Sequence, residues 1–396
     1  MATFTERLIT TLIASQWCEQ TNNHDPFRFG RQQPPSLAES MKRLIIQVFG
    51  KIGFIRRSRL KKIDRRALAQ WAPHFSELDW LYATLADDES RSLLVQLIAY
   101  RLMGPKAVRL PLSTPDYWRR RSKLEKLADE SNSVPLSFNN WKLNYHDLAE
   151  IGFPLRLYVR TNGVMALFEL QQYACERAGI AVNRGDVVID GGGCFGDTAL
   201  YFSHIAGVTG RVYTFEFIPS NLQILEKNLR LNSNIARRVE VVQRPLWNKS
   251  GVPMFFTDDG PASRVSLSCP NSKSEPSTTS LSIDDFVEER ALESVDFIKM
   301  DIEGAEGAAL YGAEKTIRKF KPKLALSVYH QPQDFVQLAR FIAKLGLGYR
   351  FYLDHFTIHA EETVLFASVP AIRQISNGQA TVQSGESIDA HIKSGT

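Results

Sequence analysis

The chain has 396 residues, of which 44% are hydrophobic, and a formal net charge of +5. This length allows about two domains of roughly 150 residues each, and the composition is that of a folded globular protein. No apolar run reaches the roughly 18 residues that a membrane-spanning helix needs, and the start lacks a signal-peptide pattern, so we expect a cytoplasmic protein.

The cysteines support the same expectation. Cys18, Cys175, Cys194 and Cys269 are scattered, and no two of them have the spacing of a metal-binding or redox pair. A disulfide framework is not expected in a chain of this length, which fits a reducing compartment.

The first 150 residues are basic and have a helical pattern. They hold 23 Lys and Arg against 16 Asp and Glu, a net charge of +7, whereas the other 25 basic and 27 acidic residues give −2. Apolar residues recur at helical spacing in four segments, 7–20, 36–52, 64–75 and 91–104. Basic residues concentrate in 51–66, which is either the solvated face of an amphipathic helix or a contact for an anionic lipid, nucleic acid or glycan.

Beyond residue 150 the pattern changes to short strands. The run 153–163 predicts a strand that ends in a turn at Asn162-Gly163. From 184 onward strands alternate with helices. The expected strands are 186–190, 211–216, 239–244, 295–301 and 323–330, followed by a hairpin of 349–355 and 362–368. The expected helices are 196–207, 219–232, 304–320 and 334–346. The polar stretch 258–280 predicts an exposed loop or hairpin.

This alternation predicts an α/β fold with a mostly parallel sheet covered on both faces and one antiparallel strand from the closing hairpin. We divide the chain into a helical region at 1–150, an α/β domain at 151–368 and a disordered tail at 369–396, which lacks large apolar residues.

The segment VVIDGGGCFGDTALYF (187–202) contains the most informative turn. Gly191, Gly193 and Gly196 fit G-x-G-x-x-G, the turn that holds pyrophosphate in dinucleotide-binding folds. Asp190 and Asp197 flank these glycines, however, and full negative charges there would repel phosphate. They suit a cofactor that is cationic and has no phosphate, as S-adenosylmethionine is. The alternative for Asp190 is a carboxylate that only caps the loop.

Glu216, at the end of the second strand of this unit, is placed to accept hydrogen bonds from ribose hydroxyls. Dinucleotide-binding proteins and methyltransferases share this feature, so Glu216 supports an adenosine cofactor without choosing between them. The alternative is a surface charge.

Three segments, at 186–202, 210–232 and 295–317, resemble the FkbM-type methyltransferases, which have the class I S-adenosylmethionine-dependent fold. MDIEGAE (300–306) is the most specific part. The resemblance covers roughly 150–368 and nothing in 1–150. It implies a Rossmann-like, seven-stranded sheet with one antiparallel strand.

The resemblance also implies site residues. Asp190, Gly192 and Gly196 match the motif D-x-G-x-x-x-G, and Gln172 and Tyr173 match a segment that closes over the methionine end of the cofactor. With Asp197 from the charge argument, the expected cofactor-binding residues are Gln172, Tyr173, Asp190, Gly191, Gly192, Gly193, Gly196, Asp197 and Glu216.

The acceptor is expected at the ends of the later strands. Asp301 follows the fourth strand and is a candidate general base, metal ligand or acceptor-binding carboxylate. Glu303 and Glu306 are candidate substrate-binding residues, although Glu306 is equally suited to cap a helix. His330, with an ordinary pKa near ~6.5, is a candidate base, and His355 a candidate acceptor contact. Mg²⁺ between Asp301 and Glu303 would suit their oxygen ligands, but the spacing does not require it and we predict no metal site.

The resemblance implies methylation of a hydroxyl on a sugar or glycan, with S-adenosylmethionine as donor and no DNA partner. Two alternatives stay open, because fold and cofactor do not fix the substrate. One is an NAD-dependent oxidoreductase, favoured by the literal glycine motif. The other is a non-catalytic scaffold whose basic N-terminal region binds nucleic acid or membrane.

Overall fold

The computed structural model describes residues 2–16, 25, 63–136, 141–268 and 277–370. The expected helix at 36–52, most of the basic segment 51–66 and nearly all of the tail at 369–396 lie outside these residues. Among the described residues, no helix combines the length and the apolar character needed to cross a bilayer.

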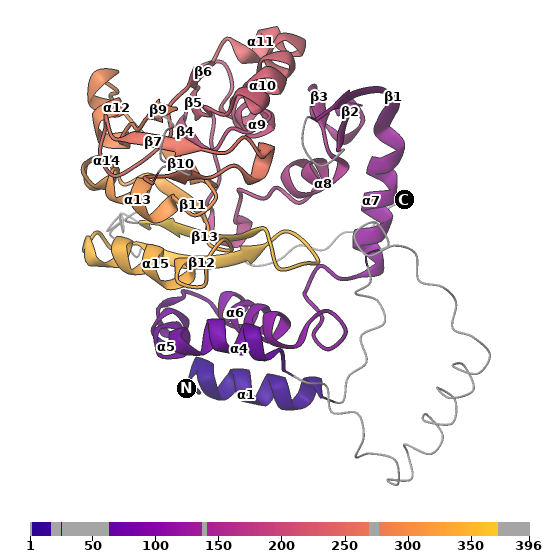
Figure 1. Cartoon of the computed structure of the whole chain (residues 1–396), viewed down its shortest axis with the longest axis vertical. Helices are drawn as coiled ribbons and strands as arrows, with labels where there is room; N and C mark the ends of the chain where they lie inside the picture. The colour runs from indigo at the N-terminus through magenta and orange to yellow at the C-terminus, as the bar shows by residue number, and fades with distance from the viewer. Residues whose placement is uncertain (1, 17–24, 26–62, 137–140, 269–276, 371–396) are drawn as a thin grey trace, which may run out of the picture.

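A seven-stranded sheet forms the centre of the molecule (Figure 1). In spatial order its strands are β12 (Arg350–His355), β13 (Thr363–Ser368), β11 (Lys323–Ser327), β10 (Phe297–Met300), β4 (Val187–Gly191), β5 (Arg211–Phe215) and β6 (Val239–Val242). Only β13 runs antiparallel to its neighbours in this sheet. The expected seven strands, one of them antiparallel, are confirmed.

Helices cover both faces of the sheet, which explains why its central strands are buried on both sides. One apolar cluster includes Phe202 of α9 (Asp197–Ala206), and α10 (Pro219–Leu231) and α11 (Ser233–Ala236) pack beside this helix. The other cluster includes Phe286 of α12 (Ile283–Glu289) and Phe335 of α15 (Asp334–Lys344).

The helix expected over 304–320 is divided into α13 (Glu306–Tyr311) and α14 (Glu314–Phe320). The division falls at Gly312, where a Cβ atom would lie 2.2 Å from the carbonyl oxygen of Trp247. The Gly312 carbonyl instead accepts a hydrogen bond from the amide of Asp284 at 2.8 Å. Close backbone packing therefore interrupts a pattern that reads as one helix.

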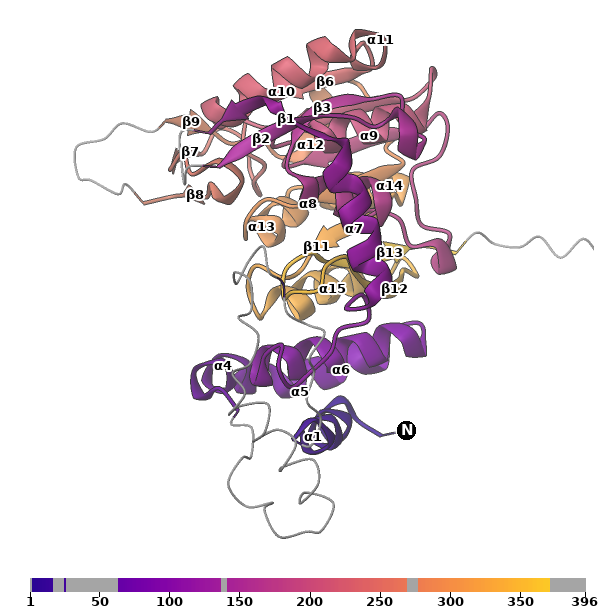
Figure 2. The ribbon, with the colours of Figure 1, turned by 90° about the vertical axis from the view of Figure 1, so that its right-hand side faces the viewer.

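The N-terminal helices lie along the β12 edge of the sheet (Figures 1 and 2). They are α1 (Phe4–Ser15), α4 (Arg65–Trp71), α5 (Phe75–Thr84) and α6 (Asp88–Met103). α6 packs on β12 and α5 on α15. Leu85 forms a parallel β-bridge with Phe351, and Arg177 forms ion pairs with both Asp87 and Asp354 at 2.9 and 2.6 Å. These helices share one apolar core with the sheet.

The region before residue 150 is not helical throughout. After α7 (Pro115–Leu127), three antiparallel strands form a separate sheet: β1 (Ala128–Pro135), β2 (Lys142–Asp147) and β3 (Arg156–Val159). β1 is mostly exposed and polar, so it lacks the alternation that identifies a strand. The sheet spans position 150, and the proposed division of the chain into domains stays a prediction.

Asn162 and Gly163 do not form the expected turn. They lie in α8 (Thr161–Val164), which continues into a π-helical segment, Met165–Glu169. The Asn162 side chain accepts a hydrogen bond from Arg121, so a tertiary contact holds it in the helix.

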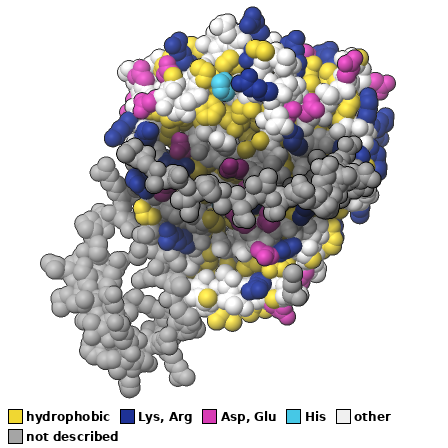
Figure 3. Space-filling model, turned by 180° about the vertical axis from the view of Figure 1, so that it is seen from behind, with side chains coloured by type: hydrophobic (Ala, Val, Ile, Leu, Met, Phe, Trp, Pro, Cys, Tyr) yellow, Lys and Arg dark blue, Asp and Glu magenta, His cyan; other side chains and the backbone are white. Residues whose placement is uncertain are grey.

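The polar stretch 258–280 belongs in part to a small antiparallel sheet of β7 (Pro253–Phe256), β8 (Val265–Ser266) and β9 (Thr278–Thr279). Single 3₁₀ turns occur at Ala72–His74, Ala149–Ile151, Glu176–Ala178 and Gly260–Ala262. On the face shown in Figure 3, the basic and acidic side chains of the described residues are interspersed.

Candidate functional site

The turn after β4 depends on glycine for its path. Gly192 has a φ of +91°, and a Cβ atom on it would lie 2.0 Å from the carbonyl oxygen of Asp301. A Cβ atom on Gly193 would lie 2.1 Å from Thr214 Oγ1. The turn therefore passes between the ends of β10 and β5 in a space that admits no side chain at either position.

Asp190, at the end of β4, is completely buried and paired within the protein. Its Oδ1 lies 3.1 Å from Nζ of Lys299, and its Oδ2 accepts hydrogen bonds from the hydroxyls of Thr198 and Thr214, both at 2.8 Å. Lys299 also donates to the carbonyls of Gly191 and Gly192 at 3.0 and 2.7 Å. Burial would lower the pKa of Lys299, but the charges of Asp190 and Asp301 raise it.

This pairing corrects one expectation. We expected the charge of Asp190 to face a cationic cofactor, but Lys299 neutralises it inside the protein, and Asp190 fixes the glycine turn instead. Asp197, in the first turn of α9, has no ion pair among the described residues, and its removal from water raises its pKa to about 6.

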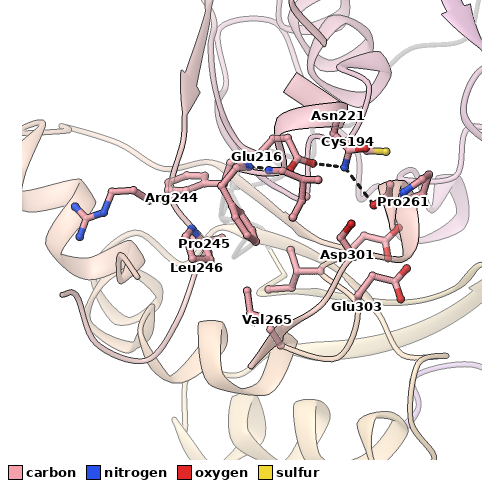
Figure 4. Close-up of a pocket in the computed structure, with 18 residues that line it drawn as sticks. Cys194, Glu216, Asn221, Arg244, Pro245, Leu246, Pro261, Val265, Asp301 and Glu303 are labelled. Carbon is pink, nitrogen blue, oxygen red and sulfur yellow. Dashed lines mark hydrogen bonds between the residues drawn. The ribbon is translucent and has the colours of Figure 1, made fainter. Parts of the chain in front are cut away.

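A pocket opens beside the glycine turn (Figure 4). Its walls come from the turn after β4, the end of β5, the start of α10 and the segments after β6, β7 and β10. The lining residues include Gly192, Cys194, Glu216, Asn221, Leu246, Pro261, Asp301 and Glu303.

The carboxylate of Glu216 lines this pocket and is fixed in place by hydrogen bonds. Its Oε1 accepts hydrogen bonds from the amides of Phe217 and Ile218 at 2.7 and 2.8 Å, and its Oε2 from Asn221 at 3.2 Å (Figure 4). Burial raises the pKa of Glu216. A carboxylate has about four lone-pair sites, so Oε2 can accept a further hydrogen bond, as a ribose hydroxyl would require.

Asp301 lies where the pocket meets the carboxyl end of β10. Its Oδ2 accepts a hydrogen bond from the hydroxyl of Tyr173 at 3.0 Å, and its Oδ1 from that of Tyr329 at 3.2 Å. Burial would raise the pKa of Asp301, but the charges of His330 and Lys299 lower it. Asp301 is therefore an ionised carboxylate held by two phenols.

His330 lies among three carboxylates. Its Nδ1 is 3.0 Å from Oε1 of Glu306, and its Nε2 is 3.4 Å from Asp301 and 3.6 Å from Glu303. Burial would lower the pKa of His330, but these carboxylates raise it to about 11 when no ion is bound. We expected a base with an ordinary pKa; the imidazole is instead protonated at neutral pH, and cannot accept a proton in that form.

The two glutamates after Asp301 differ in role. Glu306 is completely buried, and its two oxygens accept hydrogen bonds from the amides of Ile302 and Gly304 at 2.8 and 3.0 Å, so it closes the turn that precedes α13. Glu303 has a left-handed backbone with a φ of +57°, lines the pocket, and lies 3.7 Å from Arg264.

The segment before β4 reaches the same end of the sheet. Tyr173 bonds Asp301, and the amide of Gln172 donates a hydrogen bond to Glu362. Glu362 precedes β13, has a φ of +59°, and has a pKa that burial and the charge of Asp301 raise to about 8. Gln172 and Tyr173 therefore adjoin the expected acceptor side, and their contact with a cofactor stays a prediction.

His355 does not contribute to this site. Its Nδ1 bonds the hydroxyl of Thr363 at 2.9 Å, and its Nε2 bonds the carbonyl of His359 at 2.8 Å. Burial lowers the pKa of His355 to about 3, so the ring is neutral. Both ring nitrogens are occupied, which removes the reason to expect an acceptor contact.

Sequence reasoning missed Lys299, Tyr329 and Glu362. Lys299 had a signal, because a lysine within an otherwise apolar four-residue strand needs a buried partner. Tyr329 and Glu362 gave no such signal. Tyr329 reaches Asp301 because β11 pairs with β10, and the charge of Asp301 acts on Glu362 because β13 pairs with β11.

The fold and the site define a class of protein. The strand order, with one antiparallel strand second from the edge, is that of class I methyltransferases. The pocket lies at the carboxyl end of β4, where the strand order reverses, as ligand sites in such sheets do.

Residues 190–351 match the family model described as the methyltransferase FkbM domain. This match covers less than half of the chain and shows that residues 190–351 are similar to an FkbM methyltransferase domain, which supports an S-adenosylmethionine-dependent methyltransferase. Such a domain implies S-adenosylmethionine as cofactor, and the glycine turn and Glu216 both lie at the pocket. The alternative of an NAD-dependent oxidoreductase is not supported.

Solved structures of methyltransferases are similar to the chain. The methyltransferase FkbM from Methylobacillus flagellatus KT is 21% identical over 82% of this chain and 70% of its own, with a TM-score of 0.47. Fibrillarin from Aeropyrum pernix, in complex with natively bound S-adenosyl-L-methionine, is 16% identical over 60% and 99%, with a TM-score of 0.34. An S-adenosylmethionine-dependent O-methyltransferase from Thermotoga maritima is 16% identical over 49% and 62%, with a TM-score of 0.31. No curated protein matches significantly.

Proposed function

We propose that the protein methylates a hydroxyl oxygen of an uncharged sugar or glycan. The observation that supports this most is Asp301, an ionised carboxylate that lines the pocket together with Glu303. Carboxylates accept hydrogen bonds from hydroxyl groups and repel phosphates. An acceptor with several hydroxyls and no negative charge fits such a pocket wall.

S-adenosylmethionine supplies an electrophilic methyl group. The residues of the chain have to hold the acceptor oxygen in line with it and accept a proton as the oxygen attacks. Glu216 holds the adenosine end at one side of the pocket. Asp301 orients the acceptor hydroxyl at the other and accepts its proton. The two phenols and His330 fix the orientation of Asp301.

The cofactor half of this proposal is tested by calorimetric titration with S-adenosylhomocysteine. We expect Glu216→Gln to weaken binding by about 10- to 100-fold, because a hydrogen bond to a charged group contributes about 1.5–3 kcal/mol. Glu226→Gln is the matched control, because Glu226 lies exposed on α10, pairs with Arg230 and does not line the pocket. Equal affinities in wild type and Glu216→Gln would contradict the assignment.

The acceptor half is tested with S-adenosylmethionine labelled in its methyl group. The protein is incubated with fractionated cell extracts and with neutral oligosaccharides, and labelled products are identified by mass spectrometry. We expect an O-methyl ether on a carbohydrate, and turnover lowered by about 10²–10⁴-fold in Asp301→Asn with S-adenosylhomocysteine binding retained. Label in protein, RNA or an amine would contradict the proposal.

A further inference from the structure

Asp301, Glu306 and His330 converge at the end of β10 in an arrangement that the methyl transfer itself does not require. One ligand atom from each of the three residues can be chosen so that all lie within 4.8 Å of one another. His330 Nδ1 is 3.0 Å from Glu306 Oε1, and the other ring nitrogen, Nε2, is 3.4 Å from Asp301 Oδ1. One ion can be bound by only one of these nitrogens, so one carboxylate lies beside the bound nitrogen and the other lies within the 4.8 Å spread of the three ligand atoms.

The imidazole supplies a second observation. The side chain of His330 is only 3% exposed, yet neither of its ring nitrogens makes a hydrogen bond among the described residues. The carboxylate oxygens are near enough for ion pairs but do not lie along a hydrogen-bond direction. A buried polar atom without a hydrogen bond is costly, so a metal ion bound to one ring nitrogen would satisfy an atom that has only ion-pair contacts.

The carboxylates have free lone pairs to complete such a site. Each oxygen of Glu306 accepts one backbone hydrogen bond, and each oxygen of Asp301 accepts one from a tyrosine hydroxyl. A carboxylate has about four lone-pair sites, so every oxygen keeps one. The existing hydrogen bonds orient these oxygens, as partners of metal ligands do.

The balance of charge favours a divalent ion over a proton. Asp301, Glu303 and Glu306 all lie within 3.6 Å of one imidazole. Arg264 lies 3.7 Å from Glu303. This leaves Asp301 and Glu306 as the two carboxylates of the cluster that form no ion pair with another cation among the described residues. A proton on His330 balances one of these two charges, whereas a divalent ion balances both.

We propose that Asp301, Glu306 and His330 bind a divalent metal ion at the acceptor end of the site. One imidazole and two carboxylates suit Mn²⁺ or Zn²⁺ better than Mg²⁺, which prefers oxygen ligands. Three protein ligands leave positions for water or for an acceptor hydroxyl, whose proton the ion would make easier to remove. Only this last role rests on the proposed function. The inference replaces our sequence-based prediction of no metal site.

The test is calorimetric titration of the chelator-treated, full-length protein with MnCl₂, ZnCl₂ and MgCl₂. We expect one Mn²⁺ or Zn²⁺ per chain, bound more tightly than Mg²⁺. His330→Gln and Asp301→Asn should each weaken binding at least about tenfold. Glu314→Gln is the matched control, because Glu314 is an exposed carboxylate on α14 that pairs with Arg318. The metal affinity of this variant should equal that of the wild type.

Three results would overturn the inference: no binding of Mn²⁺ or Zn²⁺ at millimolar concentration, equal binding in wild type and His330→Gln, or loss of binding in Glu314→Gln as well. Each variant is also titrated with S-adenosylhomocysteine and unfolded in urea, so that misfolding is distinguished from loss of a ligand. Wild-type protein that binds S-adenosylhomocysteine but no metal refutes this inference alone. Wild-type protein that binds metal but no S-adenosylhomocysteine refutes the proposed function alone.

Discussion

Asp190 and Asp301 both lie at the carboxyl ends of neighbouring strands, β4 and β10, yet their surroundings differ. Asp190 has three partners, Lys299, Thr198 and Thr214, all inside the protein. Asp301 lines a pocket and forms an ion pair with the buried His330. Asp190 stabilises the structure of the site, whereas Asp301 is accessible to ligands from the pocket.

The difference arises from the adjacent strand rather than from either aspartate. In the register of β4 with β10, Asp190 is paired with Lys299, so a lysine comes to lie beside it. Asp301 follows the last residue of β10 and meets the phenols of Tyr173 and Tyr329. A carboxylate at a strand end therefore reveals its role only when the residues across the sheet are known.

The largest expected effect comes from breaking the enclosed pair. Lys299→Met should lower the free energy of unfolding by about 3–5 kcal/mol, because it leaves Asp190 charged, buried and without its cation. Urea unfolding measures this. The double variant Asp190→Asn/Lys299→Met removes both charges and should recover most of the loss; a double variant as unstable as the single one would show that the pair is not what stabilises the turn.

Gly192 lies in the turn between Asp190 and Asp301, so a side chain at this position should displace both aspartates. Gly192→Ala should cost about 2–4 kcal/mol and weaken S-adenosylhomocysteine binding, because its Cβ atom would meet the backbone of Asp301 as well as strain φ. Gly251→Ala is the control, since Gly251 also has a positive φ but no atom near its added Cβ. Equal losses in the two variants would mean that strain alone, without the clash, explains the effect.

The two histidines extend the comparison, because His355 resembles Asp190 in having all its partners inside the protein. Its pKa is about 3 in the folded protein and near ~6.5 in the unfolded chain, so its contribution to stability is complete above pH 6.5 and is lost as the pH falls toward 3. Between these two pH values the free energy of unfolding falls by up to about 1.4 kcal/mol per pH unit.

Urea unfolding of wild type and His355→Gln at pH 6.5 and pH 5 measures this contribution. We expect the wild type to lose about 2 kcal/mol more than the variant over this interval. Parallel losses would show that His355 is not the group that titrates.

The last comparison removes one hydrogen-bond donor at each aspartate. Thr198→Val removes a hydrogen bond to the enclosed charge of Asp190 and should cost about 1.5–3 kcal/mol. Tyr329→Phe removes one from Asp301, which water can reach from the pocket, and should cost about 0.5–1.5 kcal/mol in urea unfolding. The reverse order would mean that Asp301 is as enclosed as Asp190.

The sequence predicted the sheet well because its strands are short apolar runs separated by glycine turns and amphipathic helices. Six of the seven strands lie within two residues of the expected bounds at each end, and β11 ends at Ser327, three residues before the expected His330. β1 was missed because its polar residues lack alternation, and the break at Gly312 because its cause, Trp247, lies far away in the sequence.

The site was predicted in part. The glycine turn, Glu216 and Asp301 are local features, and the structure brings all three to one pocket. The pairing of Asp190 with Lys299, the protonation of His330 and the enclosure of His355 depend on residues from other strands. A single sequence does not show these contacts.

The contact of the N-terminal helices with β12 limits how the chain can be divided. An edge strand exposes unpaired backbone groups that can pair with another molecule. Here Leu85 bridges Phe351 and α6 packs across the strand, so the helical region shields this edge. A fragment that began at residue 151 would keep the methyltransferase motifs but would present β12 to its neighbours in solution, as a surface prone to aggregation.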